Sequence, residues 1–97
     1  MAYKIIFKQP AQREFENLTH GQKKAIAREI DKLKDDPHPP GAINLEGYPA
    51  FWRITARNIR AIYLEPLPDR TIFILRVAER KSAYEDLSSL MQLVPPD

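Results

Sequence analysis

Arginine is concentrated in the second half of this sequence, in a pattern suited to binding phosphate. Residues 53–81 contain seven basic side chains against three acidic ones, namely Arg53, Arg57, Arg60, Arg70, Arg76, Arg80 and Lys81. In residues 1–36, by contrast, six of the eight basic residues are lysines. An arginine fork can donate to two phosphate oxygens at once, whereas a hydrated lysine suits a solvent-exposed face. The second half therefore predicts a phosphate-binding surface, with charges placed only for solubility and edge protection as the alternative.

The hydrophobic pattern predicts the elements that position these arginines. Alternating apolar residues predict four strands, at residues 3–7, 51–55, 59–65 and 71–78. Helical spacing predicts two consecutive helices, one beginning near Pro10 and one that follows a capping box at Thr19 and ends before Pro37. Another capping box at Ser82 predicts a C-terminal helix. The order βααβββα indicates an α+β fold, with a helical hairpin packed on a small, mostly antiparallel four-stranded sheet.

Two connections link these predicted elements. Residues 35–49 contain prolines and glycines without periodicity, which predicts an irregular connection of about fourteen residues. Arg57 and Asn58 stand between two predicted strands and indicate a β-hairpin, in which Asn58 is expected to adopt the positive φ that tight turns need.

Alternation along the strands assigns the charged residues to one face of the sheet. If the helices cover the other face, Trp52 points towards them, while Arg53 and Thr55 point to the open face. Hairpin pairing then brings Arg60 close to this pair. The predicted cluster consists of Arg53, Thr55, Arg60, Arg76, Arg80, Lys81 and Tyr84.

Other residues that could do chemistry have plainer interpretations. Trp52 is expected in the core rather than stacked on a base. Phe51 could stack on a base or be covered by the long connection, and both alternatives stay open. His20 and His38 lie in connections and are not expected to be catalytic, although His38 would be the better candidate if the proline-rich connection folded over the sheet.

Length and composition predict a single domain over residues 1–97. A chain of 97 residues with 43% hydrophobic and 29% charged residues is long enough for one core. Its apolar runs are too short for a membrane span and no secretory signal is evident, which predicts a cytoplasmic protein. Because there is no cysteine and the two histidines are far apart, no metal or other cofactor is expected.

Four short blocks follow one another along the chain in a specific order: Leu45-Glu46-Gly47, Trp52-Arg53-Ile54, Ile59-Arg60-Ala61-Ile62-Tyr63 and Val77-Ala78-Glu79-Arg80-Lys81-Ser82-Ala83-Tyr84. With the order of elements, they resemble the RelE/ParE superfamily of toxins from bacterial and archaeal toxin–antitoxin pairs. The final arginine and tyrosine resemble the RelE branch, which cuts messenger RNA in the ribosomal A site, more than the ParE branch, which poisons DNA gyrase.

The resemblance implies cleavage without a metal ion. The 2′-hydroxyl of the substrate attacks the adjacent phosphate and leaves a cyclic phosphate and a 5′-hydroxyl. Arg60 and Arg80 are expected to stabilise the phosphate and the leaving group, Arg53 to be a supporting cation and Tyr84 to be the general base. Cations beside a phenol favour the ionised form, which can accept a proton. The residues expected to bind RNA phosphates are Lys81, Arg57, Arg76 and Thr55.

The resemblance also implies partners. A cognate antitoxin would neutralise the protein, the ribosome with mRNA would be its target, and operator DNA would be bound only through the antitoxin complex. The alternatives are a ParE-like gyrase inhibitor, a non-catalytic module for antitoxin binding and autoregulation, and a protein that binds another nucleic acid without cutting it. Arg60, Arg80 and Tyr84 separate these alternatives, because nuclease chemistry needs them and a pure inhibitor does not.

Two positions depart from the RelE-like pattern. Thr55 stands where many RelE-like chains have a second basic residue, and Glu79 stands where histidine or lysine is common. Both remove positive charge from the predicted site. Glu79 could accept a proton, but a structural ion pair with Arg80 or Lys81 is the favoured interpretation.

Overall fold

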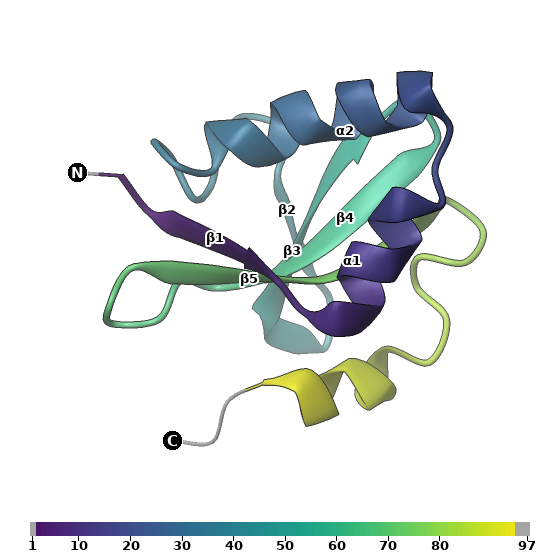
Figure 1. The fold of residues 1–97 in the computed structure, drawn as a ribbon. Coiled ribbons are helices and arrows are strands. Elements are labelled where there is room, and N and C mark those ends of the chain that lie inside the picture. The colour runs from purple at the N-terminus through teal and green to yellow at the C-terminus, as the bar shows by residue number, and fades with distance from the viewer. Residues whose placement is uncertain (1, 95–97) are drawn as a thin grey trace.

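The computed structural model describes residues 2–94. Its elements are β1 (Lys4–Phe7), α1 (Gln9–Glu16), α2 (His20–Lys32), β2 (Ile43–Leu45), β3 (Tyr48–Ala56), β4 (Ile59–Leu64), β5 (Thr71–Glu79) and the 3₁₀ helix η1 (Leu87–Leu93). The helices α1 and α2 cover one face of the sheet, here called the helix face, while η1 packs against the opposite face (Figure 1). The predicted α+β class and the helical hairpin on a sheet are confirmed.

The sheet has five strands in the order β1-β5-β4-β3-β2, so the prediction of four strands is wrong. Strand β1 pairs with β5 in parallel, and the other pairs are antiparallel. The additional strand β2 lies within the connection predicted to be irregular. It has only three residues, too few for alternation to be visible in the sequence. The Asn44 side chain supports it by donating to the carbonyl oxygens of Pro49 at 3.0 Å and Phe51 at 2.9 Å.

The capping box at the start of α2 is confirmed. The Thr19 hydroxyl accepts from the backbone N–H of Gln22 at 3.2 Å, and the Gln22 side chain accepts from the N–H of Thr19 at 3.0 Å. Two N–H groups that a helix start would leave unpaired are thus satisfied. The hairpin of α1 and α2 packs Ala11, Ile26 and Ile30 against the sheet.

The capping box predicted at Ser82 is wrong, because residues 80–86 form turns and the helix begins only at Leu87. The backbone N–H groups of Ser82 and Ala83 both donate to the Glu79 carbonyl at 2.9 Å, so the chain bends back directly after β5. Asp86 then has φ of 44°, a left-handed conformation that cannot lie inside a right-handed helix.

A β-bulge divides β5 into two halves. Ile62 pairs with Arg76, but the next residue, Tyr63, pairs with Ile74, so Leu75 is an extra residue on β5. Val77 consequently packs in the helix-face core, whereas Leu75 packs in the cluster on the opposite face. Arg76, as the partner of Ile62, shares the opposite face with it.

The turn between β3 and β4 contains two residues, as predicted, but its positive φ falls on Arg57, with φ of 57°, and not on Asn58. In a two-residue hairpin whose twist matches the strands, the first turn residue can take this conformation by itself. The sequence therefore predicted the position of the turn correctly, but it assigned the positive φ to the wrong one of its two residues.

Candidate functional site

The predicted cluster is built on the sheet face opposite α1 and α2. Thr55 on β3 pairs directly with Arg60 on β4, and Arg53 lies two residues further along β3 on the same face. The Arg53 Nη1 donates to the Thr55 hydroxyl at 2.8 Å. Thr55 therefore orients the Arg53 guanidinium, a contact that the sequence did not predict.

Arg60 is half-buried and points from the turn end of β4. Its Nη1 donates to the Arg57 carbonyl at 3.4 Å, and its Nε is buried without a hydrogen-bond partner among the described residues. Within residues 2–94, neither Arg53 nor Arg60 forms an ion pair with a carboxylate. Because a buried donor without a partner is costly, an anion that accepts from Arg60 would recover hydrogen-bonding energy.

Arg80 is held at the same end of the sheet. Its backbone N–H donates to the Asn58 carbonyl at 2.8 Å, in the turn that precedes Arg60. The side chains of Arg80 and Lys81 are exposed, and that of Tyr84 is 39% exposed. The turns of residues 80–86 thus carry two exposed cations and a phenol directly after β5, with Arg80 next to the β3–β4 turn.

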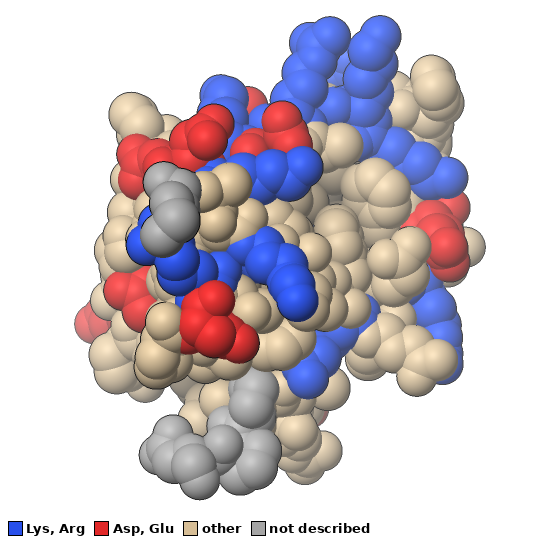
Figure 2. Space-filling view, turned by 60° about the vertical axis from the view of Figure 1, so that its left-hand side comes forward, with Lys and Arg blue, Asp and Glu red and all other residues tan. Residues whose placement is uncertain are grey.

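Two of the expected phosphate-binding residues are placed differently. The Arg57 side chain lies against the start of α2, since a Cβ at Gly21 would be 3.1 Å from its Nη1. Lys and Arg side chains also project from the top of the molecule, where α2 lies (Figure 2). The Arg76 Nη1 donates to the carbonyl oxygens of Ala83 and Glu85. The structure therefore directs the Arg57 side chain to α2. Arg76 lies on the same face as Arg53, across Ile62, but its side chain is bound to backbone carbonyls.

The face opposite the helices is only partly open. A second apolar cluster covers the half further from the β3–β4 turn, and its buried members are Leu45, Phe51, Ile62, Leu64, Leu75 and Leu90. Phe51 is 0% exposed and stacks against Tyr48, with ring centroids 5.5 Å apart. Of the two alternatives for Phe51, base stacking is excluded, and η1 contributes to its cover. Trp52 packs against the helix-face core, as predicted.

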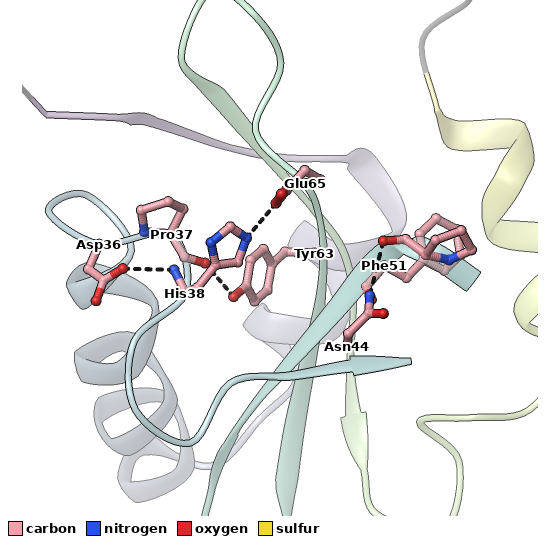
Figure 3. Close-up of polar contacts among 8 residues, drawn as sticks. Asp36, Pro37, His38, Asn44, Phe51, Tyr63 and Glu65 are labelled. Atoms are coloured by element: carbon pink, nitrogen blue, oxygen red, sulfur yellow. Dashed lines mark hydrogen bonds and ion pairs between the residues drawn. The ribbon is translucent and has the colours of Figure 1, made fainter. Parts of the chain in front are cut away.

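The proline-rich connection docks at the other end of the helix face (Figure 3). The Tyr63 hydroxyl donates to the Pro37 carbonyl at 2.6 Å, and His38 Nε2 lies 2.5 Å from a Glu65 carboxylate oxygen. The His38 ring also contacts Trp52, with centroids 4.3 Å apart. His38 thus folds over the sheet on the face away from Arg53, where it fastens a loop rather than joining the cluster.

Burial is the main reason why the pKa of Tyr63 is raised above its usual value, and the nearby carboxylates of Glu65 and Asp36 raise it further. Tyr63 therefore stays protonated and serves as a hydrogen-bond donor to the loop. Residues 2–94 contain no group of three or more histidine, cysteine or acidic side chains that could hold a metal ion. No helix in this part of the chain is long and apolar enough to cross a membrane.

No protein-family model matches the sequence, and a comparison with curated proteins finds no match. Known structures do match. A double arginine-to-alanine variant of the E. coli toxin RelE, in the free state, has a TM-score of 0.77 and 20% identity, covering 98% of this chain and 100% of that chain. The chain has the RelE fold. A chain of the archaeal RelE–RelB complex from Pyrococcus horikoshii matches with a TM-score of 0.71 and 24% identity, over 86% of this chain and 100% of that one.

The same RelE fold occurs in the E. coli toxin bound to a peptide of the antitoxin RelB. That chain has a TM-score of 0.73 and 19% identity, covering 100% of this chain and 99% of that chain. On the RelE fold of this protein, Glu79 is exposed and forms no ion pair with any described residue, so the predicted pairing with Arg80 or Lys81 is wrong. Its carboxylate is therefore a separate negative charge at the edge of the cluster.

Proposed function

We propose that this protein is the toxin of a type II toxin–antitoxin system and a metal-independent endoribonuclease that cleaves mRNA in the ribosomal A site. The main support is that Arg53 and Arg60 share one face of the sheet, while the Arg80 backbone is bound to the β3–β4 turn that precedes Arg60. None of these three arginines forms an ion pair with a carboxylate in residues 2–94, and Tyr84 follows Arg80 in the turns after β5. The RelE fold is consistent with this activity. Such a protein would work in the cytoplasm, where ribosomes translate.

The proposed reaction needs a base and positive charge. Tyr84 accepts the proton of the 2′-hydroxyl, the 2′-oxygen forms a bond to phosphorus, and the bond from phosphorus to the 5′-oxygen breaks. The products are a cyclic phosphate and a 5′-hydroxyl. Arg60 and Arg80 stabilise the charge that develops on the phosphate and the leaving oxygen, with Arg53 in support. Fixed cations of this kind are usually the largest contribution to such catalysis. Lys81 binds RNA phosphate beside them.

The proposed antitoxin partner fits the other side of the molecule. A groove of about 350 Å³ lies between the helical hairpin and β1, and its apolar lining includes Ile5, Phe7, Phe15 and Ile30. Asp31 and Lys34 also line the groove and form an ion pair with each other at 2.9 Å. A disordered acidic segment that folds on binding could bury its apolar residues here. Operator DNA would then be contacted only through the antitoxin.

The direct test is cleavage by the purified protein of mRNA positioned in the A site of programmed ribosomes. We expect codon-positioned cuts that persist when divalent ions are chelated from the cleavage step, and far slower cleavage of the same RNA in solution. Arg80→Ala should lose on the order of 10²-fold or more in rate, because it removes a cation that stabilises the transition state. Lys34→Ala is the matched control, since its side chain is exposed on the other side of the molecule.

Three results would contradict the proposed function. Equal cleavage of free and ribosome-bound RNA would contradict the ribosome dependence. DNA breaks that require gyrase, with mRNA left intact, would replace the proposal with the ParE-like alternative. Arrest of growth without damage to either nucleic acid would leave neither activity in place.

A further inference from the structure

Arg76 is hydrogen-bonded to the backbone on both sides of Tyr84. Its Nη1 donates to the Ala83 carbonyl at 2.9 Å and to the Glu85 carbonyl at 2.5 Å. The side chain is half-buried and forms no ion pair with another described residue. A single guanidinium nitrogen thus holds the carbonyl groups of the residues immediately before and after Tyr84.

The bulge at Leu75 directs Arg76 towards these carbonyls. Strict alternation from Ile74, which packs in the helix-face core, would turn residue 76 towards α1 and α2. The extra residue in β5 reverses this direction, so that Arg76 pairs with Ile62 on the site face. Bulges beside functional sites commonly re-aim a side chain in this way.

The segment has little else to fix Tyr84. Ser82 and Ala83 are tied to the end of β5 through the Glu79 carbonyl, and Ala83 is fully buried. After Ala83, the Glu85 N–H donates to the Ser82 carbonyl at 3.2 Å, which is a long hydrogen bond. The Arg76 contacts are therefore the shorter restraints on the backbone around Tyr84.

We propose that Arg76 is a positioning residue, which holds the Tyr84 hydroxyl in place for proton transfer through the carbonyls of Ala83 and Glu85 and does not bind RNA phosphate. The inference rests on the proposed nuclease function. A displacement of about 1 Å in a reacting group can cost on the order of 10²-fold in rate. Arg76 should therefore affect the rate of the chemical step more than the affinity for RNA.

The test compares Arg76→Met, which is similar in length but has no donor, with Arg76→Lys, which keeps one donating group. We measure single-turnover cleavage on programmed ribosomes, affinity across a salt series and amide hydrogen exchange of residues 83–86 in the free protein. Arg76→Met should cleave roughly 10- to 100-fold more slowly, with unchanged affinity and faster amide exchange at Glu85. Arg76→Lys should recover part of the rate.

Lys81→Met is the matched control, because it removes an exposed cation from the same segment. It should lower the affinity and reduce the dependence of log affinity on log salt by about one phosphate contact, while amide exchange stays unchanged. If Arg76→Met gives this salt result instead, Arg76 binds phosphate and the inference is overturned. It is also overturned if Arg76→Met leaves the rate or the exchange of Glu85 unchanged.

Tyr84→Phe separates two kinds of failure. If Tyr84→Phe cleaves at the full rate, the proposed role of Tyr84 is wrong, and the positioning role of Arg76 is wrong with it. If Tyr84→Phe is slow and Arg76→Met is not, only the inference about Arg76 is overturned. If Arg76→Met does not fold, Arg76→Lys decides. Lysine keeps the charge, so a residue that only bound phosphate would keep its salt dependence and most of its rate. A positioning residue would lose rate and show faster amide exchange at Glu85, because the paired contacts to Ala83 and Glu85 are lost.

Discussion

Two tyrosines of this protein have the same chemistry and opposite surroundings. Tyr63 is fully buried on the helix face and donates to the Pro37 carbonyl, while Tyr84 is 39% exposed in the turns that follow Arg80 and Lys81 in the chain. Burial keeps the Tyr63 phenol neutral, whereas the Tyr84 phenol is open to solvent and to a substrate. The two residues can therefore be separated by the same small substitution, which removes only the hydroxyl.

Tyr84→Phe should slow cleavage steeply with little change in affinity for the programmed ribosome. The ring is kept, so stacking and packing survive, and only the proton-transfer group is lost. The measurement is the single-turnover rate alongside the dissociation constant. Near wild-type cleavage by this variant would remove the general-base role and direct attention to Glu79, the nearest exposed carboxylate before Arg80 in the chain.

Tyr63→Phe should leave cleavage intact and lower stability by about 1 kcal/mol, the usual net contribution of a hydrogen bond. Because the folded protein raises the pKa of Tyr63 above its unfolded value, the stabilisation is complete below about pH 10 and is lost as the pH rises further. Urea unfolding between pH 8 and 11 should therefore show a steeper alkaline loss in the wild type than in Tyr63→Phe. Parallel curves would contradict this assignment.

At the scale of elements, the sequence predicted what periodic patterns encode. The helical hairpin, the capping box at Thr19 and the three long antiparallel strands were visible because each repeats its signal over several residues. The three-residue strand β2 and the bulge at Leu75 were not, since pairing with a distant strand decides both. The false capping box at Ser82 has the right residue types, but tertiary contacts bend residues 80–86 into turns.

In the candidate site, the sequence predicted the residues placed by regular strand pairing but not the side chains directed by the turn or the bulge. Alternation placed Arg53 and Thr55 on one face and pairing brought Arg60 to them, because both follow from strand geometry alone. The direction of Arg57 depends on a turn conformation and on the absence of a side chain at Gly21, and neither is encoded in the local pattern. The contacts of Arg76 depend on the bulge, so its position on β5 did not reveal them.

The β3–β4 turn gives an element-scale prediction. Arg57 has φ of 57°, where a side chain is strained, so Arg57→Gly should stabilise the fold by roughly 0.5 kcal/mol after the greater flexibility of unfolded glycine is offset. Asn58→Gly is the matched control and should destabilise, because Asn58 has no positive φ. Chemical denaturation measures both. If Arg57 also binds RNA phosphate, Arg57→Gly will lower the salt dependence of binding by about one contact.

At the scale of the whole molecule, the proposed antitoxin groove and the proposed cleavage site lie on opposite sides of the sheet. The groove lined by Phe7, Phe15 and Ala27 lies on the side of the helical hairpin, while Arg53 and Arg60 face the other side of the sheet. Ala27→Glu places a carboxylate in the groove and should weaken antitoxin binding at least tenfold without slowing cleavage, because an acidic partner is repelled and its apolar contacts are lost. Arg28→Glu, on the same helix outside the groove, is the control in a binding titration.

Because the two faces are separate, an inactive variant should compete with the wild-type toxin for the antitoxin. Arg80→Ala should fold and bind antitoxin normally, because the Arg80 side chain is exposed at the far end of β5 from the groove. Expressed in excess in cells that hold a balanced amount of toxin and antitoxin, it should sequester the antitoxin and release wild-type toxin, so that growth stops. The double variant Ala27→Glu, Arg80→Ala should not, since it can neither cut RNA nor hold the antitoxin. Growth arrest by this double variant, or its absence with Arg80→Ala alone, would show that the two faces are not independent.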